Sequence, residues 1–104
     1  MVSDMEENKM QINLPPEVAG GVYSNLAIIA HSPSEFVIDF VSVMPQVQPA
    51  QVRSRVILTP ENTKKLLLAL QDNIRKYEQQ FGKISINPNL PSNTAPMSFG
   101  GGEA

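Results

Sequence analysis

The stretch QVRSRVILTPENTKKLLLAL, residues 51–70, contains a change of hydrophobic period. Up to Thr59 the chain alternates in the way of a strand with one buried face. From Pro60 onward the apolar residues recur every three or four positions, which is typical of a helix. The stretch therefore predicts a strand over Gln51–Thr59 that leads directly into a helix.

Start and stop signals define the ends of this helix. Thr59 is a good N-cap residue, Pro60 suits the first helical position, and Gly82 suits the position just past the last turn. Six apolar residues between these ends form one stripe: Leu66, Leu67, Leu70, Ile74, Tyr77 and Phe81. The charged residues of the helix have mixed signs and indicate a solvated face.

Three further strands are predicted upstream, and all of them are rich in β-favouring or alternating residues: Met10–Leu14, Gly20–His31 and Ser34–Val43. The first stops at Pro15, because proline cannot continue a ladder. Residues 44–50 contain two prolines and are predicted as a loop. The order predicts an α+β fold, ββββα: a four-stranded antiparallel meander followed by one long C-terminal helix packed on one sheet face. The helix would be roughly 33 Å long and a nine-residue strand roughly 30 Å, so one helix can cover one face.

Composition bounds the class of protein. The 104 residues suffice for one small domain, predicted over residues 9–86, with a flexible lead over 1–8 and a flexible tail rich in Pro, Gly and Ser over 87–104. The lack of cysteine excludes disulfides and thiolate chemistry. No apolar run approaches the ~20 residues of a membrane span, and the acidic start is unlike a signal peptide. A cytoplasmic protein without a membrane partner is expected.

Two hairpins predict the register. A tight SPS turn would place Asp39 opposite Leu26 and Phe36 opposite Ile29. A symmetric loop over 44–50 would place Asp39 opposite Arg55, and would bring together the pair Val41 and Arg53. Asp39 and Arg55 are thus predicted to form a cross-strand ion pair, which adds little stability but penalises wrong pairings.

Alternation then assigns the side chains to two faces. The face predicted to lie under the helix is almost purely apolar: Ala27, Ile29, Phe36, Ile38, Phe40, Val52, Val56 and Leu58. The opposite face, the second sheet face, mixes apolar and charged residues: Leu26, Ile28, Val37, Asp39, Val41, Arg53, Arg55 and Ile57. This second face is too apolar to be left in water. A second copy of the chain is the expected cover, as a homodimer or higher oligomer.

The only histidine, His31, lies beside the predicted turn, with Glu35 near it. Two such ligands do not make a zinc site, which needs three or four. No Ser/His/Asp spacing or second carboxylate accompanies the histidine for acid–base work. A structural role is therefore predicted for His31, with no catalytic residue, no metal and no cofactor.

Four segments together resemble a known family: GVYSN (21–25), HSPSEFVIDF (31–40), SRVILTPENTKKLLLAL (54–70) and NIRKYEQQFGKI (73–84). They are similar to a family of small bacterial and archaeal proteins of unknown function, over roughly residues 11–84. The resemblance implies no assigned activity, cofactor or catalytic residue. By analogy of architecture alone, ββββα is also similar to SecB-like export chaperones and to dimeric β4-α regulators that bind single strands.

Three functions follow as hypotheses. The first is a non-catalytic, homo-oligomeric interaction module that binds itself, or another protein or peptide. The second is a single-stranded nucleic-acid binder that uses these residues: Arg53, Arg55, Lys64 and Lys65, with Tyr23 or Phe36 as stacking platforms. The net charge of -2 and 6% aromatic content argue against it. The third, a small enzyme, would need a pocket that these residues do not assemble.

Overall fold

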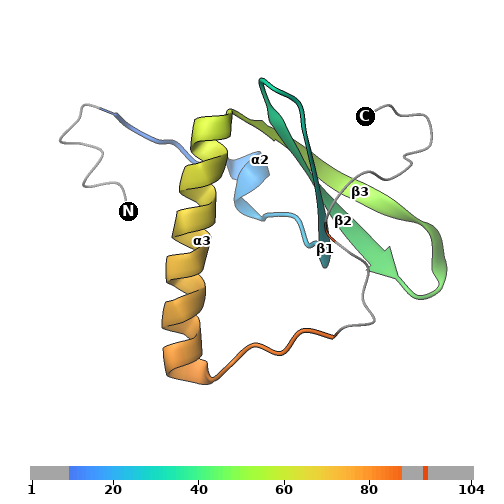
Figure 1. The fold of residues 1–104 in the computed structure, drawn as a ribbon. Coiled ribbons are helices and arrows are strands. Elements are labelled where there is room, and N and C mark those ends of the chain that lie inside the picture. Colours follow the sequence, from blue (N-terminus) through green and yellow to red (C-terminus); the bar gives the residue numbers. More distant parts are fainter. Residues whose placement is uncertain (1–9, 88–92, 94–104) are drawn as a thin grey trace.

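The computed structural model describes residues 10–87 and Asn93. Its elements follow in the order α2 (Pro16–Ala19), β1 (Leu26–His31), β2 (Phe36–Met44), β3 (Val47–Leu58) and α3 (Pro60–Phe81). The three strands form one antiparallel sheet with β2 in the centre, and α3 runs beside it (Figure 1). The fold is therefore α+β, as predicted. The predicted flexible lead, residues 1–8, and most of the predicted tail lie outside the described residues.

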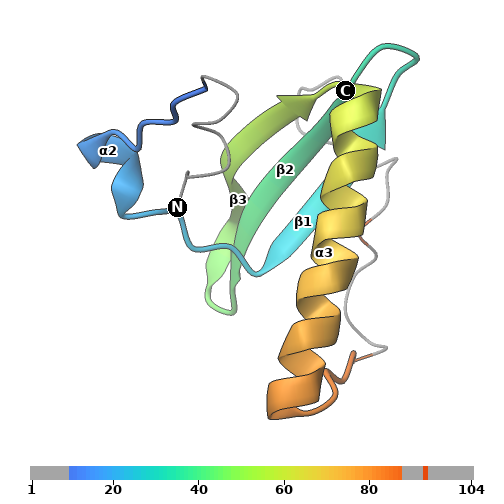
Figure 2. The ribbon, with the colours of Figure 1, turned by 90° about the vertical axis from the view of Figure 1, so that its left-hand side faces the viewer.

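The predicted fourth strand is not formed within the described part of the chain. Met10–Leu14 belongs to neither helix nor strand, and Pro16 and Glu17 then begin the one-turn helix α2. Figure 2 shows α2 projecting away from the sheet. The sequence contained a signal for this turn, since proline at the first helical position and an acidic residue after it favour a helix start.

Strand β1 is shorter than predicted, because it begins at Leu26 and residues 20–25 lie outside it. Gly20 ends α2, and Gly21 has a φ of 80° that favours glycine. The N–H of Gly21 donates to the Val18 carbonyl at 3.0 Å. The two glycines therefore turn the chain out of α2 before the strand begins.

The predicted loop over residues 44–50 is wrong. A two-residue turn, Pro45 and Gln46, joins β2 to β3, and β3 begins at Val47. Pro49 lies inside this strand. It is tolerated there because β3 is an edge strand, where one side of the backbone lacks a ladder partner.

The β1–β2 register differs from the prediction by two residues. Asp39 lies opposite Ile28 rather than Leu26, and Phe36 lies opposite His31 rather than Ile29. The turn is longer than expected: the Ser32 N–H donates to the carbonyl of Glu35 at 2.9 Å, and the Ser32 hydroxyl accepts from the Glu35 N–H at 3.2 Å. An even shift leaves every β1 side chain on its predicted face.

The β2–β3 register confirms one predicted pair and corrects the other. Asp39 lies opposite Arg55, as predicted. The register then shifts, and Val41 lies opposite Val52 rather than Arg53. Arg53 is the extra residue of β3 and forms a β-bulge. Val52 therefore shares the face of Val41 instead of the face predicted to lie under the helix.

The core lies along the central strand. Its buried apolar side chains are Ile28, Ile38 and Val41, and two polar residues are buried with them, Asp39 and Ser42. The side chain of Asn25 extends the ladder: its amide donates to the Val43 carbonyl at 2.9 Å and its oxygen accepts from the Val43 N–H at 2.8 Å.

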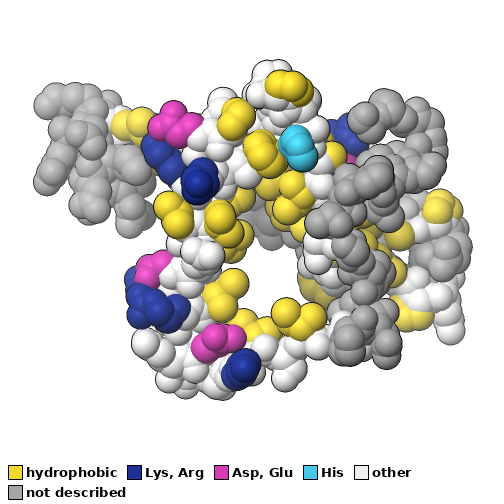
Figure 3. Space-filling view, in the orientation of Figure 1, with side chains coloured by type: hydrophobic (Ala, Val, Ile, Leu, Met, Phe, Trp, Pro, Cys, Tyr) yellow, Lys and Arg dark blue, Asp and Glu magenta, His cyan; other side chains and the backbone are white. Residues whose placement is uncertain are grey.

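Helix α3 has the predicted ends. The hydroxyl of Thr59 accepts from the Asn62 N–H at 3.2 Å, and Pro60 is the first helical residue. Gly82 ends the helix with a φ of 102°, and its N–H donates to the Glu78 carbonyl at 3.0 Å. The predicted packing of this helix on the sheet is not seen, because none of its residues is buried. Figure 3 shows an opening between α3 and the sheet with hydrophobic side chains along its rim.

Candidate interaction surface

The apolar residues of α3 form a continuous stripe that stays exposed in the described part of the chain. This α3 stripe has side chains 37% to 66% exposed, and its members are Leu66, Leu67, Leu70, Ile74, Tyr77 and Phe81. The rings of Tyr77 and Phe81 lie 5.0 Å apart and continue the stripe to the end of the helix. An amphipathic helix of a globular protein normally buries such a stripe. In this structure the α3 stripe is not buried.

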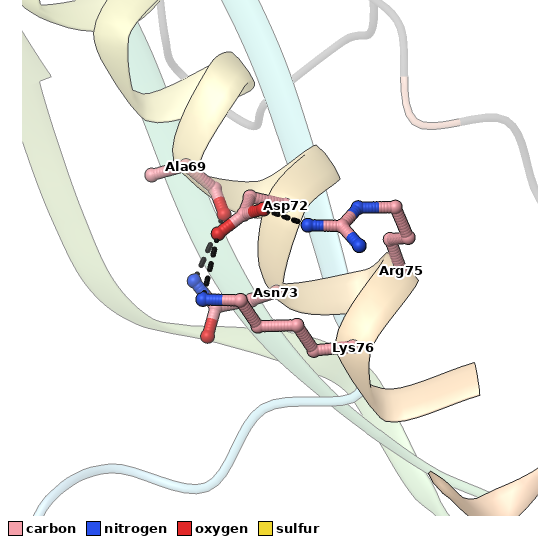
Figure 4. A network of polar contacts seen from close by, with 5 residues as sticks. All are labelled: Ala69, Asp72, Asn73, Arg75 and Lys76. Atoms are coloured by element: carbon pink, nitrogen blue, oxygen red, sulfur yellow. Dashed lines mark hydrogen bonds and ion pairs between the residues drawn. The ribbon is translucent and has the colours of Figure 1, made fainter. Parts of the chain in front are cut away.

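Five charged residues of α3 form ion pairs within the helix. Asp72 accepts from Arg75 at 2.5 Å and lies 2.9 Å from the Lys76 ammonium (Figure 4). The hydrogen bond from Lys76, and then that from Arg75, lowers the pKa of Asp72 below its ordinary value of 3.8. Lys65 lies 3.5 Å from Glu61, one turn away. Each of these five side chains therefore has a partner of opposite charge on its own helix.

The predicted ion pair on the second sheet face is formed. Arg55 donates to both carboxylate oxygens of Asp39, from Nε at 2.6 Å and from a terminal nitrogen at 2.8 Å. Asp39 is only 2% exposed, whereas the Arg55 side chain is 49% exposed. The pair therefore joins the core of the sheet to its surface, in the bidentate geometry that is specific to arginine.

The other predicted interface residues differ in exposure. Ile28 and Val41 are buried within the single chain, and Leu26 and Val37 are half-buried. Three members of the face remain exposed: Arg53, Arg55 and Ile57. The surface that this face offers to another molecule is thus narrower than the sequence indicated.

The chain also exposes an apolar N-terminal arm, of which the sequence analysis singled out Tyr23 alone, as a stacking platform. Its large apolar side chains are each more than half exposed: Met10, Ile12, Leu14, Val18, Val22 and Tyr23. The alternation of residues 10–14 was the available signal, but it was interpreted as the first strand of the sheet. The arm adds to the apolar surface that the single chain does not cover.

Comparison with known proteins gives the family. The sequence pattern of the family described as "Protein of unknown function (DUF3467)" matches residues 2–86. The chain belongs to this family. No curated protein and no solved structure shows significant similarity to it. The resemblance noted in the sequence is thus confirmed, and the family carries no assigned activity.

The only histidine of this DUF3467 protein packs beside an aromatic ring. The imidazole of His31 and the ring of Phe36 lie 5.4 Å apart at directly paired positions of β1 and β2. Within residues 10–87 and Asn93, no group of three or more His, Cys, Asp or Glu side chains is arranged to hold a metal ion. In that same part of the chain, no helix has the length and apolar character needed to cross a bilayer.

Proposed function

We propose that this DUF3467 protein is a homo-oligomeric, non-catalytic interaction module in which the α3 stripe of one copy packs against the α3 stripe of a second copy. One observation carries the proposal: a helix of 22 residues presents an apolar stripe, and none of its residues is buried. Most helical stability in proteins comes from packing an amphipathic face. A contiguous exposed apolar patch of this kind marks an interaction site.

The charges around the stripe favour a second copy as the partner. Asp72, Arg75 and Lys76 pair with one another on the same helix, so the surface left for a partner is the apolar stripe rather than these charges. An apolar stripe is complementary to itself. Such a patch suits a two-fold symmetric dimer, in which the same surface is used on both subunits.

The second sheet face contributes a smaller contact in this proposal. Ile57 is 56% exposed and lies opposite Val37, beside the ordered Asp39–Arg55 pair. Arg53, in the bulge, and Arg55 would border that contact. A paired charge at the edge of an interface favours correct alignment more than it adds affinity.

A non-catalytic role is supported by the way the ionisable side chains are used. Asp39 accepts two hydrogen bonds from Arg55, and Asp72 is held by two cations. The His31 ring packs beside that of Phe36. The side chains of Asp39, Asp72 and His31 therefore each make contacts that stabilise the fold, which favours a structural role for them over a catalytic one.

Sedimentation velocity on matched variants tests the proposal. Leu70 lies on the stripe and is 50% exposed; Leu68 is 55% exposed but lies on a different side of the helix, since two residues are separated by roughly 200°. Leu70→Glu is expected to shift the protein to the monomer, while Leu68→Glu leaves the oligomer intact. The same oligomeric state in both variants would contradict stripe-to-stripe packing.

A peptide-holding, SecB-like role is the second candidate, because the same exposed stripe would suit an unfolded apolar segment. It predicts that the wild-type protein suppresses the aggregation of an unfolded client and that Leu70→Glu abolishes the suppression. Binding of single-stranded nucleic acid is less well supported, since Arg55 is engaged by Asp39 and Lys65 by Glu61. Fluorescence anisotropy with a labelled oligonucleotide would detect it as binding that weakens with salt.

A further inference from the structure

The N-terminal arm extends away from the rest of its own chain. Figure 2 shows α2 standing apart from both the sheet and α3. Among the described residues, the backbone hydrogen bonds of the arm run to the carbonyls of Pro15 and Val18, which belong to the arm itself. The Leu14 side chain is 65% exposed. The described part of the chain therefore leaves this apolar segment without cover.

The two adjacent prolines of the arm prepare it for binding. Pro15 has φ -62° and ψ 146°, which is the polyproline II conformation, and Pro16 then begins α2. Because proline fixes φ, such a segment loses little conformational entropy when it binds. Proline-rich segments in this conformation dock on surfaces that are lined with aromatic rings. The arm therefore favours an aromatic surface as its binding site.

The last turns of the α3 stripe have this aromatic character. Tyr77 and Phe81 are 50% and 66% exposed, and their ring centroids lie 5.0 Å apart with the planes inclined by 45°. The arm of the same chain lies elsewhere. Both ribbon views show α2 level with the first half of α3 rather than with its end at Phe81 (Figures 1 and 2). A contact between the arm and these rings therefore requires a second copy.

Antiparallel packing of two α3 helices brings the arm and the rings together. When two helices run in opposite directions, the first half of each lies beside the second half of the other. Each arm is level with the first half of its own α3, so it then lies near the last turns of the partner helix. The arm also enlarges the interface. A stable interface uses about 20–30 residues a side, whereas the α3 stripe supplies six and the arm six more.

We propose that residues 14–16 of one copy dock on the rings of Tyr77 and Phe81 of a second copy, so that two antiparallel α3 helices exchange their N-terminal arms. This inference rests on the proposed function, because it requires the stripe-to-stripe dimer and assigns the direction of its helices. The contact is made by leucine and proline side chains against exposed aromatic rings, which offer a large apolar surface.

Paramagnetic broadening of NMR signals tests the contact between copies. The chain has no cysteine, so Asn13→Cys provides a single attachment point for a nitroxide label beside Leu14. The labelled protein is refolded together with wild-type protein that carries ¹⁵N, so any broadened amide resonance reports a contact between two chains. Broadening is expected at residues 77–81 and not at residues 60–64. Broadening at residues 60–64 instead would indicate parallel helices and overturn the proposal.

A substitution in the arm tests how much the contact contributes to association. Leu14 is exposed and lies outside the helices and strands, so Leu14→Glu leaves the fold of the single chain intact. Loss of a leucine that is buried between copies is expected to raise the dissociation constant of the dimer roughly tenfold or more. Asn13→Glu adds the same charge at the adjacent exposed position and is the matched control. Equal dissociation constants for the two variants would overturn the arm contact.

The oligomeric state distinguishes a failure of this proposal from a failure of the proposed function. A dimer in light scattering whose residues 77–81 show no broadening in the mixed sample would overturn the arm contact and leave the stripe-to-stripe dimer standing. A monomer would overturn both. A dimer with broadening at residues 77–81 supports both.

Discussion

Asp39 and Arg55 lie directly opposite each other on β2 and β3, and two hydrogen bonds of 2.6 and 2.8 Å join the carboxylate to the guanidinium. The Asp39 side chain is buried, whereas the Arg55 side chain is half exposed. The two residues therefore have unequal roles: Arg55 satisfies a charge that the core would otherwise hold unpaired. The pair also fixes the register of β3, which bulges only two residues away at Arg53.

Replacement of Arg55 should lower the stability of the folded protein. Arg55→Met leaves the Asp39 carboxylate without its partner and is expected to lower the free energy of unfolding by about 1–3 kcal/mol. The cost stays below the ~3–5 kcal/mol of fully buried pairs, because the guanidinium is half exposed and screened by water. Urea denaturation at one fixed protein concentration measures it.

Arg53→Met is the matched control for that change, since it removes an exposed arginine two residues away and should alter stability by less than about 0.5 kcal/mol. The double variant Asp39→Leu/Arg55→Met should recover most of the loss. Equal stabilities of Arg55→Met and Arg53→Met would show that the pair contributes nothing to the fold.

The N-terminal cap of α3 gives a second prediction. The Thr59 hydroxyl accepts from the Asn62 N–H, one of the donors that a helix start leaves without a partner. Thr59→Ala is expected to cost about 1 kcal/mol of stability, while Thr59→Ser, which keeps the hydroxyl, should cost much less. Thermal unfolding followed by circular dichroism distinguishes the two, and indistinguishable midpoints would argue against a capping role.

Asp72 should show a measurable pH dependence. Because the hydrogen bonds from Lys76 and Arg75 lower its pKa in the folded protein, the carboxylate contributes stability at pH values above its ordinary pKa of 3.8. That contribution is lost as the pH falls through the lower folded pKa. Lys76→Ala is expected to raise the pKa of Asp72 toward 3.8, and Lys64→Ala is not. NMR titration of the Asp72 carboxyl tests this, and an unshifted value in Lys76→Ala would refute the assigned cause.

The second sheet face is tested at Ile57, its most exposed apolar residue. If this face contacts a second copy, Ile57→Glu should raise the dissociation constant of the oligomer in a dilution series. Gln51→Glu, which adds the same charge at an exposed position of the same strand, is the control. Equal dissociation constants for the two variants would remove this face from the interface.

Local signals in the sequence were sufficient for some elements. Both ends of α3 followed from Thr59, Pro60 and Gly82, because caps are set by residues adjacent to the helix. The face of each β1 residue also followed, since the turn length was wrong by an even number of residues. The Asp39–Arg55 pair was predicted correctly although the predicted loop was wrong, because the register shifts between the turn and this pair offset the error in loop length.

Other features depend on contacts that the sequence pattern does not specify. No glycine marks the bulge at Arg53. The in-and-out alternation of side chains was therefore continued past this residue, and Val52 was assigned to the wrong face. Pro49 indicated a loop, whereas an edge strand accepts it. The stripe on α3 was visible in its spacing, but spacing alone gives no indication of which surface covers the stripe.

Multi-angle light scattering of the wild-type protein at micromolar concentration tests most directly whether that stripe is covered by a second copy. The chain has a mass of 11.4 kDa. The proposed stripe-to-stripe packing predicts a species of at least twice that mass. A single species of 11.4 kDa at the same concentration would contradict it.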